Sequence, residues 1–303
     1  MFLLPTAAQP LADVFDPDAL WVHSGPWGPG GLEGPVRRCP HGVSRRVRAC
    51  EYVTRSARAP ASRRRRWRAY LPPQHGAWAM LAVPFLIGAL VGGADRLQVP
   101  LFVAWIAGYL LSYYAFQTLR VRRRRSRYAE QLAVYGTVAT ACAVVVLIAR
   151  PEVMWLALAY APLLAVNAVY AYRRDDRALV NDLSSVVQAC AMAPVAYWVG
   201  GGESGGTAAA LFAVTALYFT GTVLYVKTMI RERGDAVFYR VSVGYHVLAL
   251  AAAAVLDAWL LAPFAVYLAR AALLPSRGWK PKQVGVLEMG NCALLVVVTA
   301  LTL

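Results

Sequence analysis

The chain consists largely of long apolar runs that carry almost no charge and are separated by short polar segments. A helix needs about 20 residues, with a range of about 17–25, to cross the hydrocarbon core of a bilayer. In lipid, all backbone groups must be bonded internally, so runs of this length predict membrane-crossing helices. We expect nine, over residues 76–94, 99–119, 129–149, 153–172, 183–200, 207–226, 240–256, 258–275 and 284–303. The seventh and eighth are short and flank Asp257, so one re-entrant pair is the alternative.

The placement of basic residues predicts the orientation of these helices. The chain has a net charge of +15, and 59% of its residues are apolar. There are 17 Lys and Arg in the connections after even-numbered runs, counted with the basic residues at the ends of those runs. The opposite connections hold only Arg96 and Arg150. Basic connections stay in the cytoplasm. We therefore expect an all-α bundle of about nine transmembrane helices with its N-terminus inside and its C-terminus outside.

The first part of the chain differs from the rest. Residues 1–68 are rich in Gly, Pro, Ser and Arg and lack a sustained hydrophobic period, which predicts a disordered basic cytoplasmic tail. Residues 69–303 form the predicted membrane domain. Basic clusters beside apolar runs usually meet anionic headgroups, so we expect membrane lipids as partners and no nucleic acid. The turn at residues 200–206, which is rich in Gly, is expected to be a flexible outer connection.

Polar residues collect near the cytoplasmic ends of the predicted helices, where candidate substrate-binding residues are found. Gln74 and His75 stand at the mouth of the first helix, and an interfacial anchor is the alternative role for His75. Gln117 and Arg120 end the second helix, one turn apart on a common face. Ionisable groups at membrane depth are costly and usually face a cavity or each other, which favours a functional site here.

A third group follows the fourth helix. Asn167, Tyr170 and Arg174 are expected on one face, and an Asn inside the membrane needs a partner. Carboxylate oxygens suit Mg²⁺, so the nearby acids are candidate metal ligands, and ion pairs with neighbouring arginines are the alternative. These acids, with Asp235 from further along the chain, are Asp175, Asp176, Asp182 and Asp235.

A fourth group lies at the sixth and later helices. Lys227, Arg231 and Asp235 recur every four residues, which predicts one helical stripe. A Lys and an Arg at a helix end suit a phosphate or carboxylate. His246 and Glu288 lie within later helices, and Lys227, Arg231 or His246 are the expected partners of Glu288.

Two short segments carry a resemblance to a known family. The stretch from Pro73 to Met80 (Pro-Gln-His-Gly-Ala-Trp-Ala-Met) and the later Lys280-Pro-Lys-Gln-Val-Gly285 with Glu288 resemble the YwiC-like membrane proteins. The resemblance covers about residues 70–303 and implies a multi-pass protein of a bacterial cell membrane. Membership of this family by itself indicates little about a mechanism.

The apolar part is more distantly similar to the UbiA-type intramembrane prenyltransferases. That resemblance implies nine helices, a cytoplasm-facing cavity and two Asp-rich motifs that bind Mg²⁺-diphosphate. The stretch from Tyr113 to Arg120 stands at the place of the first motif without an Asp. At the second, Arg231 replaces the first Asp and Asp235 keeps the last.

These residues predict a protein that binds an anionic, lipid-tailed molecule such as an isoprenyl diphosphate in a cytoplasm-facing cavity. They leave open whether Mg²⁺ takes part and whether a prenyl group is transferred. A small-solute or ion transporter is the first alternative, which broken helices with midplane polar sites would favour. A non-catalytic accessory membrane protein is the second.

Overall fold

The structure is a computed structural model that describes residue 70, residues 75–121 and residues 125–303. The side chains at positions 75, 125–126 and 156–157 are outside this description. The predicted tail, residues 1–68, and the candidate Gln74 therefore lie outside the described residues, as does the side chain of His75. All described residues belong to one compact unit.

Every regular element among the described residues is helical. The α-helices are α2 (His75–Gly92), α3 (Gln98–Arg120), α4 (Ala129–Ala149), α5 (Val153–Arg173), α6 (Leu179–Cys190), α7 (Met192–Val199), α8 (Gly205–Ile230), α9 (Ala236–Leu256), α10 (Leu261–Leu273) and α11 (Pro281–Thr302). Three short 3-10 helices are η1 (Arg125–Tyr128), η2 (Ala258–Leu260) and η3 (Pro275–Arg277). Because α6 and α7 together occupy the fifth predicted span, the described helices match the expected nine segments.

The length and apolar character of these helices make the chain a multi-span membrane protein. Seven spans of at least 18 residues are apolar enough to cross a bilayer, and two shorter apolar helices cover Gly76–Gly92 and Ala258–Leu273. Large apolar side chains point outward with no protein cover, such as Val255 at 87% and Leu301 at 81% exposure. A soluble protein rarely exposes so much contiguous apolar surface, whereas lipid tails cover it without cost.

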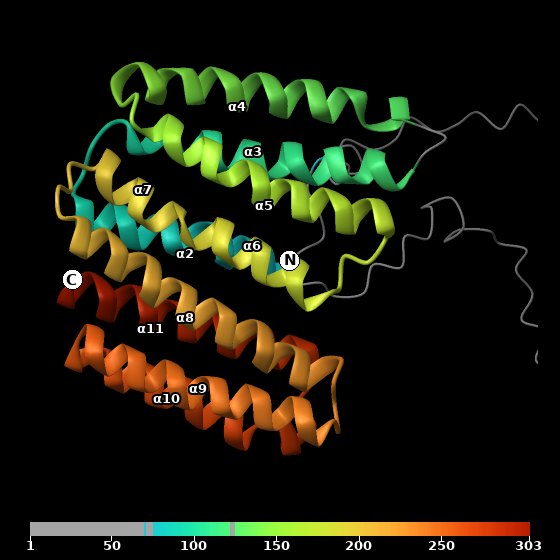
Figure 1. Ribbon diagram of the computed structural model, residues 1–303, viewed down its shortest axis with the longest axis vertical. Helices are drawn as coiled ribbons and strands as arrows, with labels where there is room; N and C mark the ends of the chain where they lie inside the picture. Colours follow the sequence, from blue (N-terminus) through green and yellow to red (C-terminus); the bar gives the residue numbers. More distant parts are fainter. Residues whose placement is uncertain (1–69, 71–74, 122–124) are drawn as a thin grey trace, which may run out of the picture. The chain divides into compact units, whose positions relative to one another are not determined.

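The helices differ in how much protein surrounds them. In the apolar 18-residue stretch of each helix that can cross the membrane, 61% of the residues are buried in α6–α7 and 56% in α8. The corresponding shares are only 11% in α4 and 6% in α5. Helices α3, α4 and α5 lie on one side of α2 and α6–α7, while α8 and α11 lie on the other side, followed by α9 and α10 (Figure 1). Helices α6–α7 and α8 are therefore the centre of the bundle, and α4 and α5 are its lipid-facing edge.

Helices α2 and α7 approach each other closely at two glycines of α2. A Cβ atom added at Gly88 would lie 2.0 Å from the carbonyl oxygen of Ala193, and one at Gly92 would lie 2.3 Å from that of Tyr197. The two glycines are four residues apart, which places both on one face of α2. This is the small-residue spacing that lets membrane helices approach closely.

Substitution of Gly88 by alanine is expected to destabilise the bundle by about 1–3 kcal/mol, because the backbone of α7 must move to admit the methyl group. Gly108, in the middle of α3, has no atom within 4 Å of an added Cβ and is the matched control. Gly108→Ala is expected to be neutral or to stabilise α3 by up to about 1 kcal/mol. Unfolding in mixed detergent micelles measures both, and equal stability of the two variants would contradict this packing.

Two boundaries differ from expectation. The fifth span begins at Leu179 and is interrupted at Ala191, three residues before Pro194. Proline lacks the N–H that would bond one turn back, which explains the break. The predicted stripe of Lys227, Arg231 and Asp235 is wrong, because α8 ends at Ile230 and Gly234 turns the chain with a φ of +90°.

Asp235 serves the next helix instead of the predicted stripe. Its carboxylate accepts hydrogen bonds from the backbone N–H groups of Val237 and Phe238, at 2.8 and 3.0 Å, at the start of α9. A side chain in this position satisfies N–H groups that have no partner within the helix. Asp235 is therefore the N-cap of α9.

Candidate functional site

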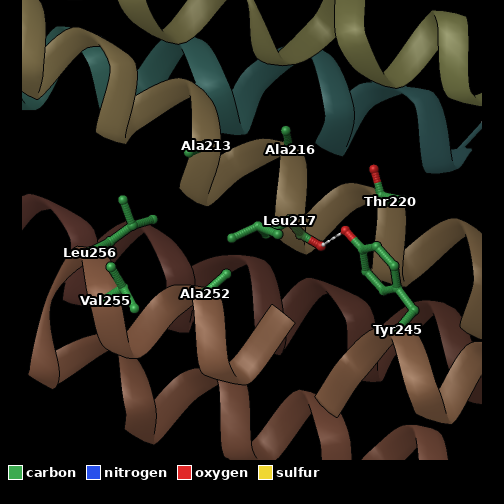
Figure 2. A pocket seen from close by; sticks show the side chains of 8 residues that line it. All are labelled: Ala213, Ala216, Leu217, Thr220, Tyr245, Ala252, Val255 and Leu256. Atoms are coloured by element: carbon green, nitrogen blue, oxygen red, sulfur yellow. Dashed lines mark hydrogen bonds between the residues drawn. The ribbon is translucent and has the colours of Figure 1, made fainter. Parts of the chain in front are cut away.

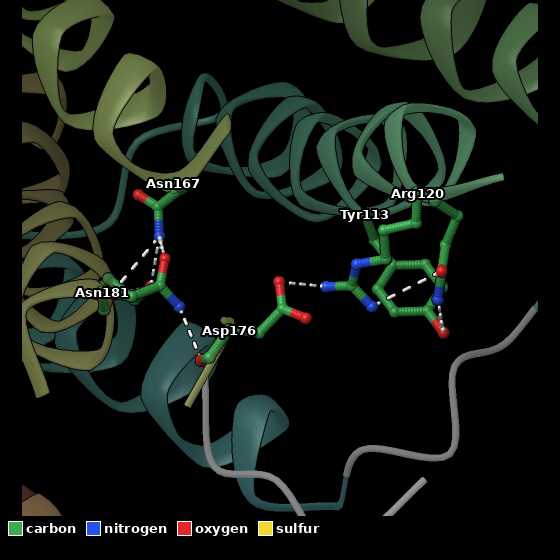
Figure 3. Close-up of polar contacts among 7 residues, drawn as sticks. Tyr113, Arg120, Asn167, Asp176 and Asn181 are labelled. Atoms are coloured by element: carbon green, nitrogen blue, oxygen red, sulfur yellow. Dashed lines mark hydrogen bonds and ion pairs between the residues drawn. The ribbon is translucent and has the colours of Figure 1, made fainter. Parts of the chain in front are cut away.

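Basic and acidic side chains from α3, α6 and α8 meet around the connection between α5 and α6. Arg120 at the end of α3 forms an ion pair with Asp176 at 2.5 Å (Figure 3). The guanidinium of Arg174 donates a hydrogen bond to the carbonyl oxygen of Arg120 at 3.2 Å. We define the basic cluster as these side chains together with the charged residues beside them at the end of α5, in the α5–α6 connection and at the end of α8. Its bases are Arg120, Arg173, Arg174, Arg177, Lys227 and Arg231, and its acids are Asp175, Asp176 and Asp182.

A second ion pair of the basic cluster is deeply buried. The ammonium of Lys227 on α8 lies 2.9 Å from the carboxylate of Asp182 in the first turn of α6, with side-chain exposures of 9% and 6%. Lys227 also donates a hydrogen bond to the carbonyl oxygen of Arg177 at 2.8 Å. The pair links α8 to the start of α6. Because both side chains are largely shielded from water, removal of either one would leave the other as an unpaired buried charge.

Arg231 caps α8 one turn beyond Lys227. Burial lowers the pKa of its guanidinium from the ordinary value, and the nearby Asp182 carboxylate opposes this shift only in part. A guanidinium stays charged under all ordinary conditions, so Arg231 contributes a full positive charge. The basic cluster thus combines two ion pairs with an excess of positive charge.

Gln117 and Tyr113 extend the cluster along α3. The side-chain amide of Gln117 donates a hydrogen bond to the Tyr113 hydroxyl at 3.0 Å, and Arg120 donates one to the side-chain amide oxygen of Gln117 at 3.4 Å (Figure 3). The expected common face of Gln117 and Arg120 is therefore present. Together these contacts orient the Arg120 guanidinium toward Asp176.

Asn167 has the partners that its depth in α5 requires. Its amide nitrogen donates hydrogen bonds to the side chains of Asn181 at 2.9 Å and Ser185 at 2.8 Å (Figure 3). Its amide oxygen accepts hydrogen bonds from Gln188 at 2.6 Å and from Ser184 at 3.1 Å. These four partners all belong to α6, so the network joins α5 to the helix that carries Asp182. Arg174, by contrast, leaves the predicted face because it ends α5 with a left-handed φ of 60°.

The partner of Glu288 is Arg270, and the predicted partners Lys227, Arg231 and His246 are wrong. Arg270 on α10 is only 4% exposed and forms an ion pair with Glu288 on α11. Its guanidinium carbon lies 4.9 Å from the ring centre of Tyr225, 5.1 Å from Tyr267 and 5.4 Å from Tyr218. Aromatic faces attract a cation at this range.

Further hydrogen bonds complete this second polar site between α8, α10 and α11. Arg270 donates to the Thr222 hydroxyl at 2.9 Å, and the hydroxyls of Thr222 and Tyr218 each donate to Glu288 at 3.2 Å. Asn291 donates to the same carboxylate at 3.3 Å. Arg270 lies inside the predicted span 258–275, between uncharged residues. A charge at that depth is a sequence signal for a buried partner, and it was missed because Arg270 was counted among the bases of the connections.

The remaining candidates are dispersed. His246 is 3% exposed on α9, and its Nδ1 lies 2.7 Å from the carbonyl oxygen of Ser242. Tyr170 lies half-buried on α5. Among the described residues no three His, Cys, Asp or Glu side chains converge as metal ligands. Asp176 and Asp182 contact bases and Asp235 caps α9, so these predicted metal candidates do not form one site.

An apolar groove of about 520 Å³ lies between α8 and α9 (Figure 2). Tyr245 closes one end, where its hydroxyl donates a hydrogen bond to the carbonyl oxygen of Leu217 at 3.1 Å. Exposed Val255 at the other end places the groove at the lipid-facing surface. Its lining consists of Ala213, Ala216, Leu217, Thr220, Tyr245, Ala252, Val255 and Leu256.

Comparison with known proteins gives one consistent result. The chain is 34% identical over 236 residues to the uncharacterized protein YwiC of Bacillus subtilis, and the match covers 77% of this chain and 98% of that protein. The YwiC-like protein family matches residues 71–197. The chain belongs to the YwiC-like family.

A second relative of this YwiC-like protein is an uncharacterized protein of Haemophilus influenzae. It is 29% identical over 225 residues, which cover 74% of this chain and 94% of the relative. Neither name describes an activity. No solved structure matches this YwiC-like protein. The family match covers Arg120, Asn167, Asp176 and Asp182 and ends before α8, so the basic cluster straddles its boundary.

Proposed function

We propose that this YwiC-like protein binds an anionic, lipid-tailed molecule of the isoprenyl diphosphate type on the cytoplasmic side of a bacterial cell membrane. The observation that carries the proposal is the meeting of bases from α3, α8 and the α5–α6 connection around the first turn of α6. Bases outnumber acids there, and Arg offers a bidentate fork and Lys a point charge to a phosphate.

The course of α8 supports a ligand with an apolar tail. Ala213 and Thr220 in the groove are seven residues apart, and Lys227 follows at the same spacing, so the groove and the basic cluster share one stripe of α8. Arg231 lies about 16 Å along the helix from Thr220 at a rise of 1.5 Å per residue. In this proposal the tail of a ligand whose headgroup lies at the basic cluster passes Tyr245, at the end of the groove nearer the cluster, and extends toward Val255 at the lipid-facing end.

The chemistry of the cluster favours binding without a divalent cation. Mg²⁺ needs carboxylates that are available as ligands. Asp176 and Asp182 each contact a base instead. In this proposal the excess positive charge of the basic cluster neutralises the diphosphate directly. Arg231 contacts the diphosphate, which competes with Asp176 for Arg120 and with Asp182 for Lys227. Binding of this kind does not require transfer of the prenyl group.

Charge reversal at Arg231 tests the proposal. We expect the Arg231→Glu variant to bind geranylgeranyl diphosphate at least about tenfold more weakly than the wild type, because a charge-assisted hydrogen bond contributes about 1.5–3 kcal/mol. The measurement is a binding titration of the full chain in detergent without Mg²⁺ and then with it.

Arg240→Glu is the matched control, since Arg240 is an exposed base on α9, outside the basic cluster. It is expected to keep wild-type affinity. Equal affinity of the Arg231→Glu variant and the wild type would sink the proposal, as would binding that depends entirely on Mg²⁺.

A transporter is the second candidate, favoured by the interruption between α6 and α7. Discontinuous helices that carry polar groups inside the membrane line solute sites in many transporters. Here the Asn167 network lies on the α6 side of the break at Ala191. Solute or ion flux into proteoliposomes that Asn167→Leu abolishes and Arg231→Glu leaves intact would favour this function over lipid binding.

A further inference from the structure

A second groove lies at the end of the bundle opposite the basic cluster. It has a volume of about 580 Å³ and lies between the α4–α5 connection and the α7–α8 connection. Both connections turn at the left end of the bundle in Figure 1. The lining residues are Arg150, Glu152, Val153, Trp155, Ala159, Trp198, Gly201, Gly202 and Glu203.

The groove carries charges of both signs that are available to a ligand. Glu152 and Glu203 are exposed and Arg150 is half-exposed. Across the described part of the chain, no ion pair or side-chain hydrogen bond involves these three residues. An acid on each connection thus faces the groove together with one base.

The position of Glu203 is fixed by the turn that precedes it. A Cβ atom at Gly202 would lie 2.3 Å from the ring of Tyr197, so only glycine allows the turn to fold onto that ring. The N–H of Gly202 donates to the Tyr197 carbonyl oxygen at 2.9 Å, and the N–H of Ser204 donates to the Tyr197 hydroxyl at 3.2 Å. The turn that the sequence suggested to be flexible is therefore packed and holds Glu203 at the groove.

Aromatic and apolar side chains complete the surroundings. Trp155 is 73% exposed and Trp198 is 38% exposed. Tryptophan is typical of the level of the lipid headgroups. Exposed Met154 and Leu158 continue the apolar surface along α5. A ligand held in this groove therefore also contacts the acyl region of the bilayer, which favours a lipid over a free solute.

We propose that this groove binds the headgroup of a zwitterionic phospholipid with a primary amine, such as phosphatidylethanolamine. Arg150 contacts the phosphate, while Glu203 and Glu152 accept hydrogen bonds from the ammonium. The tryptophan rings offer the ammonium a cation–π contact, and the acyl chains lie along α5. Two acids beside one base disfavour an anionic lipid, so the site is distinct from the basic cluster and does not depend on the ligand proposed there.

Lipid titration of the delipidated full chain, followed by native mass spectrometry, tests this site. The wild type is expected to retain phosphatidylethanolamine in preference to both phosphatidylglycerol and phosphatidylcholine, whose quaternary ammonium cannot donate hydrogen bonds. Arg150→Gln and Glu203→Gln are each expected to weaken phosphatidylethanolamine binding about two- to fivefold, the range for partly exposed charge pairs.

The control is Arg96→Gln, an exposed base at the same end of the bundle outside the groove lining. It should bind phosphatidylethanolamine as the wild type does. None of the three substituted side chains is buried, so the packing should stay intact, which thermal unfolding checks. Absence of a headgroup preference, a preference for phosphatidylglycerol, or equal losses in the groove variants and Arg96→Gln would overturn the proposal.

Discussion

Replacement of Glu288 by leucine is expected to lower the free energy of unfolding by about 3–5 kcal/mol, the cost of leaving a buried charge without its partner. The charge left behind is the Arg270 guanidinium, which is 4% exposed and cannot lose its proton. Unfolding in mixed micelles of mild detergent and dodecyl sulfate measures the change.

Arg270→Met is expected to cost less than Glu288→Leu, because an isolated carboxyl can take up a proton and keeps hydrogen bonds from Tyr218 and Thr222. The double variant Arg270→Met/Glu288→Leu should regain most of the lost stability, since a buried ion pair and an apolar pair of similar size are often close in free energy. Lys282→Leu, at an exposed position of α11, is the control and should change stability by less than about 1 kcal/mol. A double variant that is less stable than either single variant would contradict this account of the pair.

Asp182→Asn is expected to cost about 3–5 kcal/mol as well, because Lys227 is left buried between α6 and α8 without an acid. Asp175→Asn, seven residues earlier, removes an exposed acid of the basic cluster and should stay within about 0.5 kcal/mol of the wild type. The same unfolding measurement compares the two.

The proposed function adds a second expectation for this variant. Asp182 competes with an anionic ligand for Lys227, so Asp182→Asn should bind geranylgeranyl diphosphate more tightly than the wild type, even though the protein is less stable. Opposite changes in stability and affinity separate a ligand site from a purely structural ion pair. Parallel losses of both would show that Lys227 serves only to join α6 and α8.

The sequence predicts the spans well because hydropathy and length are local properties. All nine expected segments coincide with described helices, and the all-α membrane architecture is confirmed. Helix ends set by single residues are harder to predict. The stripe from Lys227 to Asp235 failed because Gly234 admits a left-handed turn that helical spacing alone does not reveal.

Partnerships between helices could not be predicted from spacing, because they depend on how distant segments pack. Arg270 and Glu288 are 18 residues apart, and the aromatic cage around Arg270 comes from α8 as well as α10. Asn167 was correctly expected to need a partner, but its partners on α6 follow only from the contact between α5 and α6. The spacing of Gly88 and Gly92 is a sequence signal for close helix packing. That spacing alone does not indicate that the neighbouring helix is α7.

Native mass spectrometry of the full chain purified from its own membranes tests the central proposal most directly. We expect an anionic, lipid-tailed molecule to co-purify without Mg²⁺, and to be lost from the Arg231→Glu variant but not from Arg240→Glu. A protein that carries no such molecule, and remains empty when isoprenyl diphosphates are added, would contradict the proposed binding function and make flux measurements the next experiment.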